Sequence, residues 1–171
     1  PGVDARLAAE VRSVCGARSP TMADVPQLSF TRAVFSEAMR LRPPAYATSR
    51  EVVAPIVLGG HEIPVGAQVL VSPWVTQRDP RWWSDPLRFD PDRWLAPRSE
   101  PSHKGAYFPF GAGTRICIGE QFAWTEGILL LATIVRHWRF TLTVPAATVR
   151  PQAAVTLRPS PGVPVVCSRR P

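Results

Sequence analysis

The sequence predicts an α+β protein that is mainly helical, and three observations carry that prediction. Apolar residues recur at helical spacing in three segments, whereas residues 51–71 hold short strand-like runs separated by glycine and proline. The 20 prolines concentrate at residues 43–109 and from residue 145 onward, which indicates long irregular connections. A chain of 171 residues with 45% hydrophobic residues can bury one core, so we expect one domain or part of one.

Each helix has its own signal. Apolar residues at positions 3, 7, 11 and 14 lie on one face of a first helix, which Gly16 ends. Residues 30–41 form a second helix that stops before the proline pair at 43–44. A third helix begins just after Cys117 and runs to about Trp138. Its apolar run at 127–135 is too short to cross a bilayer, so we expect no membrane segment.

The strands are shorter and more closely spaced. Residues 51–58, the glycine pair at 59–60 and residues 61–63 read as strand, turn and strand, and residues 68–71 read as another strand. A Trp- and Pro-rich stretch at 78–98 shows no sustained period. Three further short strands are expected toward the end of the chain, at residues 140–144, 154–157 and 163–167.

Charge and cysteine content exclude several classes of function. The net charge is +7, but the basic residues are scattered, so we expect no nucleic-acid partner. An electropositive face for an acidic redox partner and ordinary surface charge both remain open. Cys15, Cys117 and Cys167 lie far apart with no ligand spacing, which disfavours zinc sites, iron–sulfur sites and a disulfide scaffold. A reducing, cytoplasmic location is expected.

The most informative segment is residues 108–119, which read FPFGAGTRICIG. Its glycines let the backbone adopt unusual dihedral angles and approach a flat ligand closely. Cys117 lies just before a helix N-terminus, where free N–H groups favour a thiolate over a thiol. Arg115 adds a positive charge and a fork of donors that suits a carboxylate.

Three interpretations of this loop compete. A lone cysteine is most often a small buried apolar residue. A glycine-rich turn before a helix can instead cradle a phosphate, but this one lacks the lysine of a P-loop. The third interpretation is ligation of a haem iron by a thiolate, which uses the glycines, the helix start, the arginine and the cysteine together.

The third interpretation is supported by a motif. Phe110, Gly113, Arg115, Cys117 and Gly119 occupy every fixed position of F-x-x-G-x-R-x-C-x-G, and in this the sequence resembles the cytochrome P-450 family. The resemblance implies that family's fold, with helices, small antiparallel sheets, an irregular meander and a cysteine loop. It also implies haem b as the cofactor, bound by these five residues. Cys117 would be the axial ligand and the one metal ligand, and Arg115 would pair with a haem propionate.

Two more motifs extend the resemblance. Glu37 and Arg40 form an E-x-x-R, which alone would indicate an i,i+3 ion pair on a helix surface. In the family pattern these residues join an arginine of the meander, here Arg93 in the segment FDPDRW at 89–94, in a buried structural network. Arg50 stands at the spacing of a second propionate-binding arginine; a surface arginine is the alternative.

The departures from the family pattern are few. Gln77 stands where the family's H-R-D-P element usually has histidine, and Asp92 stands where glutamate is common. Neither position touches the iron in that family. The three histidines, His61, His103 and His137, show no pairing typical of a ligand set, so we expect none to be a ligand.

The resemblance also nominates residues that line a substrate pocket. One segment spans residues 45–49 and the other spans residues 152–155. The residues expected to line the pocket are Ala45, Tyr46, Ala47, Thr48 and Ala154. Three of them are alanines, which suggests space for a bulky apolar substrate.

By this resemblance, residues 1–171 are the C-terminal haem-binding portion of a single cytochrome P-450 domain, and the N-terminal portion is expected to be absent. No match to the family's acid–threonine helix occurs in the chain, so the piece alone is expected to be inactive, with no catalytic residue beyond Cys117. The parent protein would be a haem-thiolate monooxygenase that inserts one oxygen atom of O2 into an apolar small molecule. Its electrons would come through a ferredoxin or a flavoprotein reductase. The alternatives are a peroxygenase or isomerase of the same fold, or a non-catalytic remnant.

Overall fold

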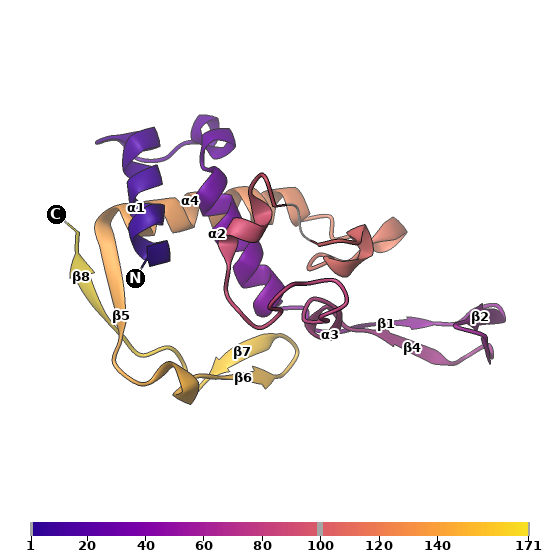
Figure 1. The fold of residues 1–171 in the computed structure, drawn as a ribbon. Coiled ribbons are helices and arrows are strands. Elements are labelled where there is room, and N and C mark those ends of the chain that lie inside the picture. Colours follow the sequence, from indigo (N-terminus) through magenta and orange to yellow (C-terminus); the bar gives the residue numbers. More distant parts are fainter. Residues whose placement is uncertain (1, 99–100, 171) are drawn as a thin grey trace.

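Three helices form the body of the molecule in the computed structural model, which describes residues 2–98 and 101–170. Helices α1 (Gly2–Cys15), α2 (Ser29–Leu41) and α4 (Glu120–His137) pack against one another (Figure 1). They correspond to the three helices expected from the sequence. Gly16 ends α1 with a φ of 56°, a left-handed conformation that costs glycine little. None of the described helices is both long and apolar enough to span a membrane.

The core lies where the apolar faces of these helices meet. One cluster joins Val11 and Cys15 of α1 to Ile128 and Ala132 of α4, with Leu28 at the start of α2. A second cluster lies one helical turn away and consists of Leu7, Ala8, Phe30 and Val135. The spacing of three or four residues within each helix is what places these side chains on one face.

The start of α2 is fixed by a residue of α1. Glu10 accepts hydrogen bonds from the backbone N–H groups of Phe30 (2.6 Å) and Thr31 (2.7 Å), and another from the Thr31 hydroxyl (2.7 Å). These N–H groups have no partner within the helix, so the carboxylate satisfies them and complements the helix dipole. The orientation of α2, which carries the E-x-x-R motif, is therefore tied to α1.

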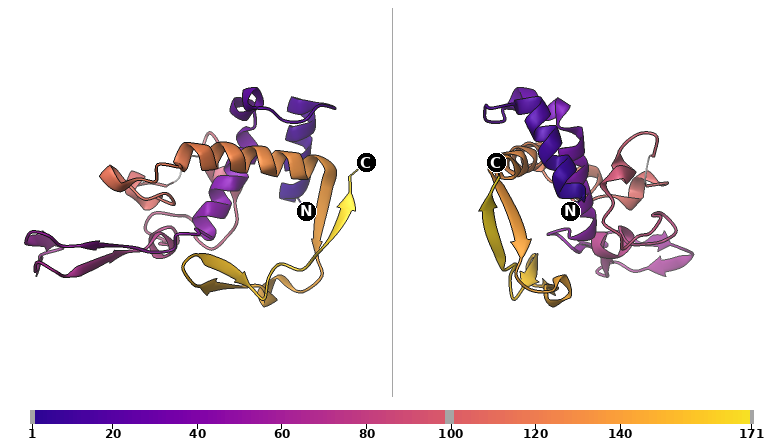
Figure 2. Two further views of the ribbon diagram at one scale, coloured as in Figure 1. Left: turned by 180° about the vertical axis from the view of Figure 1, so that it is seen from behind. Right: turned by 60° about the vertical axis from the view of Figure 1, so that its left-hand side comes forward.

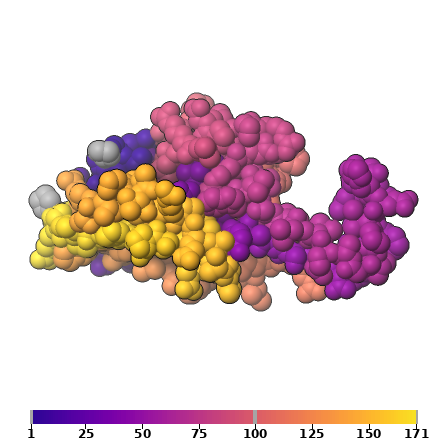
Figure 3. All heavy atoms as spheres, turned by 90° about the horizontal axis from the view of Figure 1, so that it is seen from below, coloured from indigo at the N-terminus to yellow at the C-terminus, as the bar shows by residue number. Residues whose placement is uncertain are grey.

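A narrow arm of four strands projects from the body (Figures 1 and 3). Strand β1 (Thr48–Glu51) pairs antiparallel with β4 (Gln68–Val71), and β2 (Ile56–Leu58) pairs with β3 (His61–Ile63) across the expected glycine turn. The expectation of one continuous strand over residues 51–58 was wrong. The chain breaks between β1 and β2 at residues 52–55, where Pro55 has no N–H to donate to a strand ladder.

The C-terminal region forms two further antiparallel strand pairs beneath the helices (Figure 2). Strand β5 (Trp138–Leu142) pairs with β8 (Val165–Arg169), and β6 (Arg150–Ala153) pairs with β7 (Leu157–Ser160). The strand expected at residues 154–157 is instead mostly the turn between β6 and β7. The apolar run at 153–155 suggested a strand, but Ala153 pairs directly with Leu157, which leaves only three residues to reverse the chain.

The stretch between the arm and α4 is irregular, as expected. It contains the short helix α3 (Pro73–Thr76) and the 3-10 turns η2 (Pro91–Trp94), η3 (Lys104–Ala106) and η4 (Gly113–Arg115). Turn η2 packs on α2. The architecture of helices, small antiparallel sheets, meander and cysteine loop agrees with the fold class that the sequence predicted.

Candidate cofactor site

The cysteine loop leads directly into α4. Gly111 (φ 79°) and Gly113 (φ 70°) take left-handed conformations that turn the chain back on itself. The N–H of Cys117 donates to the Phe110 carbonyl (2.9 Å), which closes the loop around η4. Cys117 itself is exposed and free, three positions before Glu120, the first residue of α4. Cys117 therefore lies just before the N-terminus of a helix, where a negative charge is favoured.

Cys117 shares a cavity of about 280 Å³ with both predicted propionate-binding arginines, Arg50 and Arg115. Arg50 extends from β1, and its guanidinium donates to the Thr48 hydroxyl (3.0 Å) and the Ser49 carbonyl (2.8 Å). The two arginines also line a second hollow beside it. The remaining lining of the main cavity is mostly apolar. It comes from α2, the segment before β1, β1 itself, α3 and the loop: Met39, Pro44, Ala45, Thr48, Pro73, Phe108, Pro109, Phe110 and Gly111.

These residues fit a haem group by the chemistry of their donors. A cysteine sulfur suits iron, and two guanidinium groups suit two propionates. Apolar residues that include Pro109 and Phe110 suit the flat macrocycle between them. At Gly119, an added Cβ would lie 3.7 Å from the Cys117 sulfur, so glycine keeps that side of the sulfur uncovered.

The structure also brings Glu37, Arg40 and Arg93 together, and all three are fully buried. Arg40 donates to both carboxylate oxygens of Glu37 (2.8 and 2.9 Å), and Arg93 donates to one of them (3.0 Å). The indole N–H of Trp94 (3.0 Å) and the backbone N–H of Asp90 (2.9 Å) complete the shell of this carboxylate. Five donors on one buried carboxylate compensate its loss of water.

Arg40 carries this network into the meander. Its guanidinium donates to the backbone carbonyls of Gln77 (2.7 Å), Pro86 (2.7 Å) and Arg88 (3.1 Å). The Trp83 ring lies against it, with 4.9 Å between the guanidinium carbon and the ring centroid. An arginine has five fixed donors, so one side chain can hold several turns of irregular chain at once.

Two groups beside the network have shifted pKa values. Burial raises the pKa of the Tyr107 hydroxyl, which donates to the Ser36 carbonyl (3.2 Å) and whose ring packs on Trp94. Partial burial, together with the charges of Arg42 and Arg40, lowers the pKa of Arg78 to about 10. Arg78 stacks on Trp74 with 3.3 Å between the guanidinium carbon and the ring centroid. Both groups keep their usual charge at neutral pH.

The predicted substrate-lining residues divide into two sets. Ala45 and Thr48 line the cavity that holds Cys117, whereas Tyr46, Ala47 and Ala154 do not. The Tyr46 hydroxyl donates to the Ala154 carbonyl (3.1 Å), so the two residues lie together although 108 positions separate them. The N–H of Leu157 also donates to the Pro44 carbonyl (2.8 Å). The segment before β1 and the β6–β7 turn are thus joined by two hydrogen bonds.

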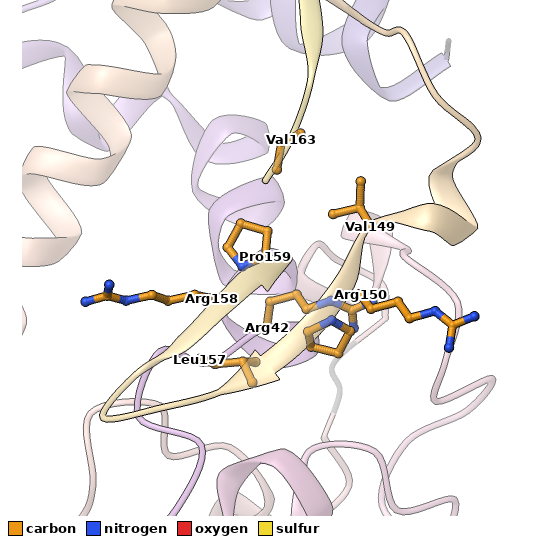
Figure 4. Close-up of a pocket in the computed structure, with 8 residues that line it drawn as sticks. Arg42, Val149, Arg150, Leu157, Arg158, Pro159 and Val163 are labelled. Atoms are coloured by element: carbon orange, nitrogen blue, oxygen red, sulfur yellow. The ribbon is translucent and has the colours of Figure 1, made fainter. Parts of the chain in front are cut away.

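A separate hollow of about 300 Å³ lies between the β6–β7 hairpin and the end of α2 (Figure 4). Leu157, Pro159 and Val163 belong to its mainly apolar lining. The charged ends of Arg150 and Arg158 point away from it in opposite directions (Figure 4). Arg42 also lines the hollow, and the described residues of the lining include no carboxylate, cysteine or histidine.

Sequence reasoning missed three residues that build the site. Met39 lies between Glu37 and Arg40 in the sequence, but helical geometry turns it to another face, where it lines the cavity. Trp124 of α4 packs on Phe110, with ring centroids 5.6 Å apart. Gln77 is fully buried, and its side-chain amide donates to the Arg40 carbonyl and accepts from the Phe108 N–H. Only Met39 carried a usable signal, because its helix was already identified.

Comparison with known proteins identifies the family. The family model described as Cytochrome P-450 matches residues 1–165. The chain belongs to the cytochrome P-450 family. Membership implies haem iron as the cofactor, and haem-thiolate enzymes of this family use a cysteine ligand.

Two curated relatives come from Streptomyces melanosporofaciens. Cyclooctatin synthase is 45% identical over 161 residues, which are 94% of this chain and 35% of that protein. Cyclooctat-9-en-7-ol 5-monooxygenase is 42% identical over 170 residues, which are 99% of this chain and 37% of that protein. The chain thus spans about a third of the length of these relatives.

A solved structure agrees with the fold. A zebra fish cytochrome P-450 studied with abiraterone has a TM-score of 0.84 and 31% sequence identity to this chain. The match covers 99% of this chain and 40% of the zebra fish chain.

Proposed function

We propose that this chain supplies the haem-thiolate side of a monooxygenase that inserts one oxygen atom of O2 into an apolar small molecule. The observation that carries the proposal is the shared cavity of Cys117, Arg50 and Arg115. We assign Cys117 as the axial ligand of haem b and the two arginines as partners of its propionates. Phe110, Gly113 and Gly119 complete the binding loop.

Bound haem supplies an iron centre at which dioxygen is reduced and one oxygen atom is transferred. The chain's own residues then have three tasks. The Cys117 thiolate would ligate the iron, and the N–H groups at the start of α4 would moderate the negative charge on the sulfur. Arg50 and Arg115 would hold the macrocycle by pairing with its carboxylates. Phe110, held by Trp124, would supply an apolar wall for the macrocycle.

The substrate we propose is mainly hydrocarbon. Ala45 contributes only a methyl group to the cavity, and Thr48 already accepts a hydrogen bond from Arg50. Tyr46 uses its hydroxyl on Ala154, which leaves it committed to the protein rather than to a ligand. A relative named for a reaction on cyclooctat-9-en-7-ol, an unsaturated alcohol, is consistent with such a substrate.

For electron delivery we propose a ferredoxin or a flavoprotein reductase, and for location the cytoplasm. The net charge of +7 supports an acidic protein partner, because opposite charge speeds encounter between redox proteins. The basic residues are scattered along the sequence, so we propose no nucleic-acid partner.

The absorption spectrum of the reduced, carbon-monoxide-bound protein tests the ligand assignment. We expect a thiolate-type Soret band in the wild type and its loss in Cys117→Ala. Cys167→Ala is the matched control, since Cys167 is also free and exposed but lies on β8. A thiolate-type band that survives Cys117→Ala would show that the ligand is another residue.

Arg50→Gln and Arg115→Gln test the propionate assignment separately. Each substitution keeps a polar side chain but removes the charge and shortens the reach. We expect each to weaken haem retention by about tenfold, the effect of losing one charge-assisted hydrogen-bond pair. Arg169→Gln, an exposed arginine on β8, should leave haem retention unchanged. Retention equal to wild type in both cavity variants would remove the arginines from the site.

A further inference from the structure

We infer that Gln77 is a positioning residue for the haem ligand, acting on the cysteine loop through the backbone of Phe108. The inference rests on the proposed function of the cavity, because it concerns how the loop that carries Cys117 is held. Nothing in the sequence pointed to this role. In the sequence, Gln77 is only a departure from a family element that usually has histidine.

The side chain of Gln77 bridges two parts of the chain that are far apart in sequence. Its amide nitrogen donates to the carbonyls of Arg40 (3.0 Å) and Met39 (3.2 Å) at the end of α2. Its amide oxygen accepts from the N–H of Phe108 (3.1 Å), the first residue of the cysteine-loop segment. The residue is 0% exposed, so none of these groups can turn to water instead.

The bridge begins at the Glu37 network. The guanidinium of Arg40 donates to the Gln77 carbonyl (2.7 Å), while the Gln77 side chain donates back to the Arg40 carbonyl. Residues 40 and 77 therefore hold each other in both directions. Arg40 is paired with the buried carboxylate of Glu37. The position of Gln77 is therefore fixed by the Glu37 network.

The bridge ends at Phe108, at the start of the loop that carries Cys117. The Phe108 carbonyl accepts from the N–H of Gly111 (3.0 Å), and the Phe110 carbonyl accepts from the N–H of Cys117 (2.9 Å). Phe108 is thus the residue at which the irregular stretch passes into the cysteine loop. The Gln77 side chain fixes the backbone there by accepting a hydrogen bond from the Phe108 N–H. Displacement of Phe108 moves the turn on which the Cys117 backbone rests.

The chemistry required at position 77 is one donor on one side and one acceptor on the other. Glutamine meets it with the two ends of its amide. A neutral imidazole also has one N–H and one bare nitrogen on opposite sides of its ring, so histidine can make the same bridge. Methionine has nearly the length of glutamine but neither a strong donor nor a strong acceptor. These two substitutions therefore separate bridging from space filling.

The experiment uses the haem-loaded protein and follows the rate at which the thiolate-type Soret band of the reduced, carbon-monoxide-bound form is lost. We expect Gln77→Met to lose the band about tenfold faster than wild type, because three buried polar groups lose their partner. We expect Gln77→His to stay within about twofold, since it keeps a donor and an acceptor. Thr31→Val is the control, because it weakens the opposite end of α2 without touching the loop.

The outcomes separate the two proposals. A wild type with no thiolate-type band overturns the proposed function and this inference together. A normal wild type with Gln77→Met no faster than Thr31→Val overturns the inference alone. Should Gln77→Met give no soluble protein, hydrogen exchange of the Phe108 amide in wild type and Gln77→His decides the question. Protection in both supports the bridge, and rapid exchange in wild type overturns it.

Discussion

The Glu37 network and the cysteine loop belong to one site but are built in opposite ways. In the network, Glu37, Arg40 and Arg93 are each 0% exposed, and five donors from within the chain surround the carboxylate. In the loop, Cys117 is exposed, and Ile118 beside it is 105% exposed. The carboxylate of the network is satisfied by donors from within the chain, whereas the loop presents groups that the described residues do not cover.

The difference shows how the chain divides stability from binding. A buried charge must be fully paired, so the network fixes the relative positions of α2 and the meander. An iron ligand must keep one face open, so the loop cannot be stabilised by burying its own sulfur. Its shape has to come from neighbours, namely the Phe110–Trp124 contact and the link from Gln77 to Phe108. Substitutions in the two regions should therefore affect different measurements.

The largest expected effect is on the network. Glu37→Ala removes the carboxylate and leaves two buried guanidinium groups without their anionic partner, which costs about 3–5 kcal/mol of unfolding free energy. Denaturant unfolding of the haem-free protein measures it. Glu126→Ala is the control, because Glu126 is an exposed residue of α4 and its loss should change stability by less than about 0.5 kcal/mol. Equal stability of the two variants would contradict the idea that the network holds the fold.

The next largest loss of stability is expected where Trp124 of α4 contacts both Phe35 of α2 and Phe110 of the loop. A Cβ at Gly127 would lie only 2.4 Å from the ring of Phe35, which packs edge-on against Trp124 with centroids 5.3 Å apart. Overpacking of this kind costs about 1–3 kcal/mol, partly offset by the roughly 1 kcal/mol that alanine gains over glycine in a helix. We expect Gly127→Ala to lower the unfolding free energy and to loosen haem retention through Trp124.

A double variant tests the physical cause. Phe35→Leu shortens the side chain that the new methyl group would meet, so it should relieve the overpacking. The cost of Gly127→Ala in the Phe35→Leu background should then fall to zero or reverse in sign. An undiminished cost in that background would mean that the ring contact is not the source of the strain.

Much of the fold could be predicted because its signals are local. The helical spacing of Leu7 and Val11, the proline pair after Leu41 and the glycine pair at 59–60 each act within a few residues. The wrong strand at residues 154–157 shows the limit. Ala154 and Val155 resemble strand residues in composition, but the pairing of Ala153 with Leu157 makes them a turn. That pairing depends on the neighbouring strand, which no local pattern reveals.

For the site, motifs predicted the groups that we propose bind the ligand, and they did not predict the groups that position them. Arg115 and Cys117 were found from their fixed spacing in one short segment. Gln77 acts across 31 positions to Phe108 and 37 positions to Arg40, so its role exists only in three dimensions. Tyr46 was assigned to the substrate, yet its hydroxyl donates to Ala154. The direction in which a side chain points in a loop is set by partners that the sequence does not order.

A smaller effect on stability is expected in the loop itself. Ile118→Ser alters a side chain that is 105% exposed, so the unfolding free energy of the haem-free protein should change by less than about 0.5 kcal/mol. The result would sharpen the contrast with Glu37→Ala, since one residue is fully buried and the other fully exposed. A loss of more than about 1 kcal/mol would mean that the loop contributes to the core in a way that its exposure does not indicate.

The last prediction concerns ligand binding rather than stability, and it distinguishes two uses of the Tyr46 hydroxyl. Tyr46→Phe removes a solvent-exposed hydrogen bond to the Ala154 carbonyl, and this bond contributes at most about 0.5–1.5 kcal/mol to stability. If the hydroxyl only holds the β6–β7 turn, the substitution should weaken binding of a hydrocarbon and of its matched alcohol by the same factor. Spectral titration of the haem-loaded protein with each compound measures both affinities. A loss confined to the alcohol would instead mean that Tyr46 leaves Ala154 to bind the substrate. In that case the open side of the site, unlike the Glu37 network, would exchange its internal hydrogen bonds for those of a ligand.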